Sequence, residues 1–140
     1  MDNLKKFLDL IAWSEGTLGR GDDGYNVIVG GGLFTDYSAH PNKLVQVKPG
    51  LKSTAAGRYQ ILKRYADAYT KMLKLPDFGP DSQDKIAIQM IKEQRAYDDV
   101  LAGRIEVAIK KCSNIWASLP GNNYNQPQHS MTALLNKFYA

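Results

Sequence analysis

The chain has 140 residues, a formal net charge of +4 and a pI of about 9.1. This length fits one compact domain, large enough to bury a core without a disulfide or a structural metal. The single cysteine excludes an internal disulfide and is typical of a protein made in a reducing compartment. The two histidines lie far apart without a Cys or carboxylate cluster beside them, so we expect no metal and no cofactor.

The first predicted element is a helix that ends at Glu15. Asp2 can cap its start and Gly16 can end it. Its apolar residues follow the i, i+3, i+4, i+7 spacing of one helical face: Leu4, Phe7, Leu8 and Ile11. Glu15 extends the same stripe. The start of this helix, a lysine pair at 5–6 followed by an apolar run, resembles a signal peptide only faintly. Because Asp9 interrupts the run and no cleavage site follows it, we expect no export signal.

Glycine-rich sequence between Gly16 and Gly57 predicts a small β-region. The runs Tyr25–Val29 and Leu33–Thr35 flank three glycines, which indicates a β-hairpin. A third short strand, Leu44–Val47, is expected to stop at Pro49-Gly50.

The rest of the chain is predicted to be helical, apart from a turn-rich loop at 119–127. Four apolar stripes carry this prediction: Ile61, Leu62, Tyr65, Tyr69 and Met72; Ile86, Ala87, Met90 and Ile91; Ile105, Ala108, Ile109, Cys112 and Trp116; Met131, Leu134, Leu135 and Phe138. We expect Cys112 and Trp116 to be buried. Strands confined to one stretch predict an α+β fold, a mainly helical lobe with a small antiparallel β-region and a ligand-binding cleft between them.

Glu15 is the first candidate for chemistry. A carboxylate at the carboxyl end of a helix, beside apolar neighbours, is stabilised in its protonated form. A raised pKa would let it donate a proton near neutral pH. A helix-end glutamate that turns to solvent is the alternative.

Four sequence segments in the same order resemble the bacteriophage lambda endolysin family. They are residues 12–17 (AWSEGT), 24–31 together with 33–38, 52–60 (KSTAAGRYQ) and 112–121 (CSNIWASLPG). The resemblance covers nearly the whole chain, and it implies one lysozyme-like catalytic domain over residues 1–140. It also implies a lytic transglycosylase, which cleaves the bond from N-acetylmuramic acid to N-acetylglucosamine and leaves 1,6-anhydro-muramoyl ends. The family's acid/base glutamate corresponds to Glu15.

The number of carboxylates separates two chemistries. Ordinary glycosidases use two, whereas a transglycosylase uses a hydroxyl of its substrate as the nucleophile, so that one can suffice. Asp22, Asp23 and Asp36 are the candidates for a second carboxylate in a hydrolytic muramidase. The family pattern has Asp where this chain has Asn26, which argues against a catalytic anion there. A non-catalytic glycan-binding module is a third possibility.

Further side chains are candidates for binding the glycan. The segment 53–60 resembles the Ser/Gly/Gln motif of lysozyme-like transglycosylases, in which Ser53, Tyr59 and Gln60 would hold polar groups of the sugar. In the alternative, Ser53 caps a helix and Tyr59 lies in the core. The other candidates lie in or beside loops: Tyr25, Asp36, Tyr37, Tyr124 and His129.

The basic charge favours an anionic partner, but no Lys/Arg run indicates nucleic acid. We expect peptidoglycan glycan strands as the partner, no nucleic acid, no stable membrane association and a monomer. The resemblance implies synthesis in the cytoplasm of a host bacterium and action on the wall in the periplasm, after release through a separate pore-forming protein.

Overall fold

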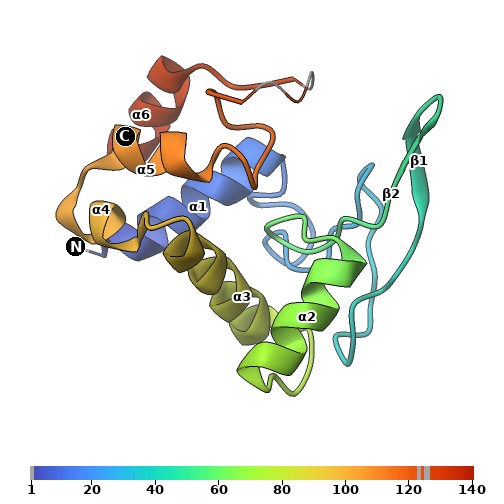
Figure 1. The fold of residues 1–140 in the computed structure, drawn as a ribbon. Coiled ribbons are helices and arrows are strands. Elements are labelled where there is room, and N and C mark those ends of the chain that lie inside the picture. Colours follow the sequence, from blue (N-terminus) through green and yellow to red (C-terminus); the bar gives the residue numbers. More distant parts are fainter. Residues whose placement is uncertain (1, 123, 125–126) are drawn as a thin grey trace. The chain divides into compact units, whose positions relative to one another are not determined.

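The computed structural model describes residues 2–122, 124 and 127–140 and has an α+β architecture (Figure 1). Its elements are α1 (Asn3–Glu15), β1 (Val45–Lys48), β2 (Leu51–Ser53), α2 (Lys63–Leu73), α3 (Pro80–Glu93), α4 (Tyr97–Ala102), α5 (Ile105–Cys112) and α6 (Met131–Tyr139). The chain divides into two compact units, a terminal unit of residues 1–16 and 87–140 and a middle unit of residues 17–86. None of the described helices is long and apolar enough to span a membrane.

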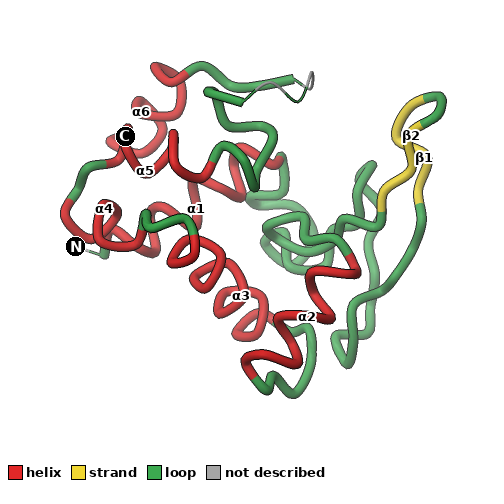
Figure 2. The backbone as a smooth tube through the Cα atoms, in the orientation of Figure 1, coloured by secondary structure: helices red, strands yellow, loops and turns green. Residues whose placement is uncertain are grey.

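The regular elements of the terminal unit are all helices in the part that the structure describes, with a long loop between α5 and α6 (Figure 2). Within it α1 contacts α4 and α6, and α5 contacts α4 and α6. The predicted apolar stripes supply its core, including Phe7 and Ile11 of α1. Burying each such side chain contributes roughly 1.5–3 kcal/mol. Trp116 and Cys112 are buried as predicted.

The middle unit is mostly loop, with its strands confined to the β1–β2 hairpin (Figure 2). These strands pair antiparallel, from Val45 opposite Ser53 to Lys48 opposite Leu51. The predicted stop of the first strand at Pro49-Gly50 is confirmed, because these two residues form the turn of the hairpin.

The hairpin predicted across Gly30–Gly32 forms only a single bridge, between Val27 and Leu33. The opposite edge of this backbone pairs with a distant segment. The amide of Val29 donates to the carbonyl of Ala55 at 3.0 Å, and the carbonyl of Val27 accepts from Gly57 at 2.8 Å. The predicted hairpin is thus present as one bridge, with residues 55–57 bonded along its other edge.

Two helices differ from their predicted patterns. The stripe predicted for α2 is not a core face, because Tyr65 is 45% and Met72 is 56% exposed. The helix buries Ala66 instead. The helix α4 lies in sequence predicted to be helical, but none of the four apolar stripes marks it as a separate helix, because it has only six residues and no side-chain cap.

Candidate functional site

Glu15 is the last residue of α1, and local signals fix that position. The side chain of Asp2 accepts a hydrogen bond from the amide of Lys5 and so caps the first turn, as predicted. Gly16 ends the helix in the left-handed conformation at φ 79°, where its amide donates to the carbonyls of Ala12 and Trp13. The carboxylate therefore meets the negative end of the helix dipole.

Burial raises the pKa of Glu15 from 4.5 to about 7, and a hydrogen bond from the Ser118 hydroxyl lowers it by a smaller amount. Part of the residue remains accessible to solvent. The Ser118 hydroxyl donates to Oε2 of Glu15, and its oxygen lies 2.6 Å from the Ser14 hydroxyl oxygen. Near neutral pH the carboxyl group thus exists in both protonation states, as required of a group that gives up a proton and later regains one.

His129 lies beside the same helix end. Its backbone amide donates to the carbonyl of Ser118 at 2.9 Å, and its Nε2 is 3.1 Å from the carbonyl oxygen of Ser14. Its ring packs on Trp13 with centroids 4.5 Å apart. The structure therefore brings the predicted residue His129 into the immediate neighbourhood of Glu15.

Tyr124 is the second loop candidate in the terminal unit. Its ring is exposed, and its hydroxyl donates to the carbonyl of Asn114 at 2.7 Å. The loop predicted at 119–127 is described for residues 119–122, 124 and 127; the others lie outside the described residues.

In the middle unit, two of the predicted tyrosines share one carboxylate. The hydroxyls of Tyr25 and Tyr59 both donate to Oδ1 of Asp84, at 2.9 and 2.6 Å. Arg58 packs against both rings. Burial, followed by the bond to Asp84, raises the pKa of Tyr25 to about 12. Tyr59 is fully buried, which is the core placement weighed as its alternative, whereas Tyr25 keeps exposed surface.

Ser53 and Gln60, the other two binding candidates of the motif at 53–60, are partly exposed. The side-chain amide nitrogen of Gln60 donates a hydrogen bond to the backbone carbonyl of Gly57 at 2.8 Å. The Ser53 hydroxyl accepts a hydrogen bond from the backbone amide of Ala55 at 3.1 Å, so Ser53 does not cap α2. The hydroxyl of Thr54 instead accepts a hydrogen bond from the amide of Lys63, the first residue of α2, at 3.0 Å.

The three candidates for a second carboxylate all accept hydrogen bonds within the middle unit. Asp22 accepts the hydroxyl of Tyr37 at 2.6 Å, and Asp23 accepts the amide of Gly19 at 2.9 Å. Asp36 accepts the amide of Ser38 at 2.8 Å, a bond that lowers the pKa of its carboxyl group. Each of them holds a turn or a neighbouring side chain.

A family model described as Endolysin matches residues 5–140. The chain belongs to the endolysin family. It is 58% identical over 138 residues to the endolysin of Escherichia phage lambda, an alignment that covers 96% of this chain and 87% of that protein. The endolysin of Escherichia phage P2 is 50% identical over 146 residues, covering 95% of this chain and 88% of that one.

Solved structures agree with this assignment. Phage lambda lysozyme in complex with a chitohexasaccharide matches with a TM-score of 0.96 at 55% identity, over 99% of this chain and 93% of that one. A second lysozyme structure from phage lambda matches with a TM-score of 0.91 at 53% identity, with the same coverage. The predicted lysozyme-like α+β fold is confirmed.

Ser118 is the residue beside Glu15 that sequence reasoning did not single out. It lies inside the segment 112–121, one of the four that resemble the endolysin family, but a serine in a loop carries no signal of its own. Only the fold shows that it reaches a carboxylate more than a hundred positions earlier in the chain.

Replacing Ser118 by Ala should raise the pKa of Glu15 above its wild-type value of about 7, because the bond that stabilises the ionised form is lost. An NMR titration of the Glu15 carboxyl carbon measures this directly. Ser113→Ala is the matched control, because the Ser113 hydroxyl donates to the carbonyl of Lys110 instead. An unchanged or lower pKa in Ser118→Ala would contradict the assigned bond.

Among the described residues, no group of three or more His, Cys, Asp or Glu side chains could hold a metal ion. Burial raises the pKa of Cys112 to about 12, so this thiol is not poised as a nucleophile. Glu15 is therefore the strongest candidate for chemistry in this member of the endolysin family.

Proposed function

We propose that this protein degrades peptidoglycan by lytic transglycosylation, with Glu15 as its acid and base. The observation that carries the proposal is the pKa of about 7 at the carboxyl group of Glu15, a residue that is only partly buried. Membership of the endolysin family and the likeness to a lysozyme bound to a chitohexasaccharide support a β-linked amino-sugar polymer as the substrate.

The reaction needs one proton to move twice. The protonated Glu15 donates to the glycosidic oxygen as the bond from N-acetylmuramic acid to N-acetylglucosamine breaks. The C6 hydroxyl of the muramoyl residue then attacks its own anomeric carbon, and ionised Glu15 accepts the proton that this hydroxyl releases. The products are a free N-acetylglucosamine 4-hydroxyl and a 1,6-anhydro end, and Glu15 is protonated again. No water is consumed.

The surroundings of Glu15 suit both halves of this cycle. Burial favours the neutral acid, whereas the Ser118 hydroxyl stabilises the anion formed after the first transfer. The two influences oppose each other and hold the pKa near the pH at which the enzyme works. A group with an ordinary pKa of 4.5 would be almost fully ionised there.

Hydrolysis is the second candidate, and the lysozyme name of the solved relatives favours it. A hydrolytic muramidase would need Asp22, Asp23 or Asp36 to direct a water or to act as a nucleophile. Because transglycosylation needs only one carboxyl group, and Glu15 has a pKa raised to about 7, it is the better supported mechanism.

Mass spectrometry of digested peptidoglycan separates the two mechanisms. Transglycosylation should give muropeptides with anhydro ends, each lighter by one water than the reducing-end product. Reducing muramoyl ends as the main product would overturn the mechanism and leave a hydrolytic endolysin. Clearing of permeabilised Gram-negative cells excludes a glycan-binding module without catalysis, because such a module would leave turbidity unchanged.

Several exposed or partly exposed side chains remain proposed contacts for the glycan: Tyr25, Tyr37, Ser53, Gln60, Tyr124 and His129. Tyr59 is left out because it is fully buried. We further propose that residues 1–140 act as one catalytic domain without a cofactor, as a monomer. On this proposal the protein is made in the cytoplasm of a host bacterium and reaches the wall through a separate pore-forming protein.

A further inference from the structure

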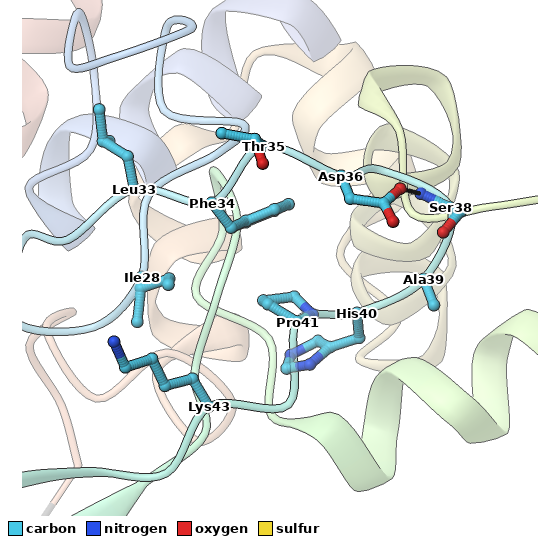
Figure 3. A pocket seen from close by; sticks show the side chains of 10 residues that line it. All are labelled: Ile28, Leu33, Phe34, Thr35, Asp36, Ser38, Ala39, His40, Pro41 and Lys43. Carbon is cyan, nitrogen blue, oxygen red and sulfur yellow. Dashed lines mark hydrogen bonds between the residues drawn. The ribbon is translucent and has the colours of Figure 1, made fainter.

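The middle unit contains a pocket of about 490 Å³ that no part of the proposed mechanism uses (Figure 3). Its walls come from the bridge region around residues 28–34 and from the segment 35–43. The residues that line it are Ile28, Leu33, Phe34, Thr35, Asp36, Ser38, Ala39, His40, Pro41 and Lys43. The whole pocket therefore lies within the middle unit.

Apolar side chains form one part of this pocket. Ile28 and Phe34 are buried, whereas Leu33 is 55% exposed. A leucine that keeps more than half of its surface in water beside two buried apolar residues offers a contact for methyl or methylene groups.

Opposite charges flank these apolar side chains. Figure 3 shows the Lys43 side chain extended toward Ile28, away from the Asp36 carboxylate, which points toward Ser38. The Asp36 carboxylate accepts a hydrogen bond from a neutral amide and stays ionised, because that bond lowers its pKa. Within the described part of the chain, neither Lys43 nor Asp36 forms an ion pair.

The wall that carries these charges is held in place by buried contacts. Both ring nitrogens of His40 are engaged, Nε2 at 2.8 Å from the carbonyl oxygen of Ile61 and Nδ1 as acceptor of the Asn42 amide at 2.9 Å. The His40 ring also packs against Phe78, and Asn42 adopts the left-handed φ of 51°. The pocket is thus preformed, which reduces the entropy lost on binding.

We propose that this pocket binds the short peptide attached to peptidoglycan strands, with Lys43 contacting a peptide carboxylate and Asp36 contacting its free amine. This inference rests on the proposed function. Such peptides carry carboxylates, a side-chain amine in walls of the diaminopimelate type, and alanine methyl groups between them. A glycan strand without its peptides has no amine, and its only carboxylates are the lactyl groups on the sugar rings, so the pocket would select strands that still carry their peptides.

The test compares two substrates for each enzyme variant, peptide-bearing glycan strands and strands from which an amidase has removed the peptides. The readout is the ratio of kcat/KM on the first to kcat/KM on the second. Lys43→Ala should lower this ratio by up to about fivefold, the upper end of the range for losing one exposed ion pair. Asp36→Asn should also lower it, because Asn retains the acceptor for the Ser38 amide but loses the charge.

Lys71→Ala is the matched control, since Lys71 is an exposed lysine of α2 outside the pocket and its loss changes the net charge equally. A ratio unchanged in both pocket variants would overturn the proposal, as would an equal fall in Lys71→Ala.

Direct binding separates failure of the pocket from failure of the proposed function. A soluble muramoyl peptide should shift the NMR signals of Phe34 and Ala39 in the wild type, and less in Lys43→Ala. If these signals shift but digestion gives no anhydro ends, the peptide site is supported and the transglycosylase mechanism is refuted. If digestion gives anhydro ends but the signals do not shift, the mechanism is supported and the peptide site is refuted.

Discussion

Replacing Glu15 by Gln should lower kcat/KM on peptidoglycan by about 10²- to 10⁴-fold, the usual contribution of a general acid or base. Gln can still accept the hydrogen bond from Ser118, but it has no proton to give to the glycosidic oxygen. The rate of turbidity loss in permeabilised cells, together with release of muropeptides, measures the effect. Substantial remaining activity would remove Glu15 from its proposed role.

The same substitution should stabilise the fold at alkaline pH, which distinguishes lost chemistry from lost structure. The pKa of Glu15 is raised from 4.5 to about 7, so the folded state keeps a proton that the unfolded state loses across this window. The free energy of unfolding therefore falls as pH rises through it, by an amount on the order of 3 kcal/mol once both states are ionised.

The glutamine side chain in Glu15→Gln carries no charge at any pH, so the variant does not lose this part of the free energy of unfolding as the pH rises. Glu15→Gln should thus be more stable than the wild type at pH values above about 7 and equal to it below about 4.5, as measured by urea unfolding at several pH values. Glu106→Gln, at an exposed position in the first turn of α5, serves as the control for loss of one negative charge. A pH-independent difference would contradict the raised pKa.

Replacing Gly57 by Ala should destabilise the protein by about 3–5 kcal/mol, because backbone strain and broken buried hydrogen bonds add together. Gly57 has φ +85°, and an added Cβ would lie 2.4 Å from Oε1 of Gln83. The Gln83 side chain is fully buried. Its oxygen accepts a hydrogen bond from the backbone amide of Arg58, and its nitrogen donates to the backbone carbonyls of Tyr25 and Phe78. Moving Gln83 would leave these groups unpaired.

Gly50→Ala isolates the strain alone. Gly50 has φ +78° in the β1–β2 turn, and nothing lies within 4 Å of its added Cβ. Its expected cost is about 1–2 kcal/mol. Urea unfolding with a constant m-value gives both free energies. Equal losses in the two variants would show that Gln83 moves away at no cost.

Local signals were sufficient for the most important part of the site. A capping aspartate, an apolar stripe and a terminal glycine predict a helix that ends at Glu15, and the structure confirms all three. The raised pKa was expected from the position of Glu15 on this stripe, and burial is its main cause in the structure. Resemblance to the endolysin family added the expected chemistry, which periodicity cannot supply.

Contacts between distant segments could not be predicted in the same way. The expected hairpin at 25–35 is reduced to one bridge, and the pairing of its other edge with residues 55–57 had no signal in the local pattern. The aromatic residues of α2 have helical spacing but lie outside the core, because spacing predicts a face without identifying what covers it. Ser118 and Asp84 acquire their roles only through bonds across many positions.

The distance in sequence between Glu15 and Ser118 also has a consequence during synthesis. A ribosome completes α1 early, but Ser118 and His129 follow only after most of the polypeptide has been translated. Until then the glutamate remains an ordinary ionised carboxylate, since the residues that enclose it do not yet exist. On the proposed mechanism, Glu15 can therefore act as an acid only after the last part of the chain has folded against α1.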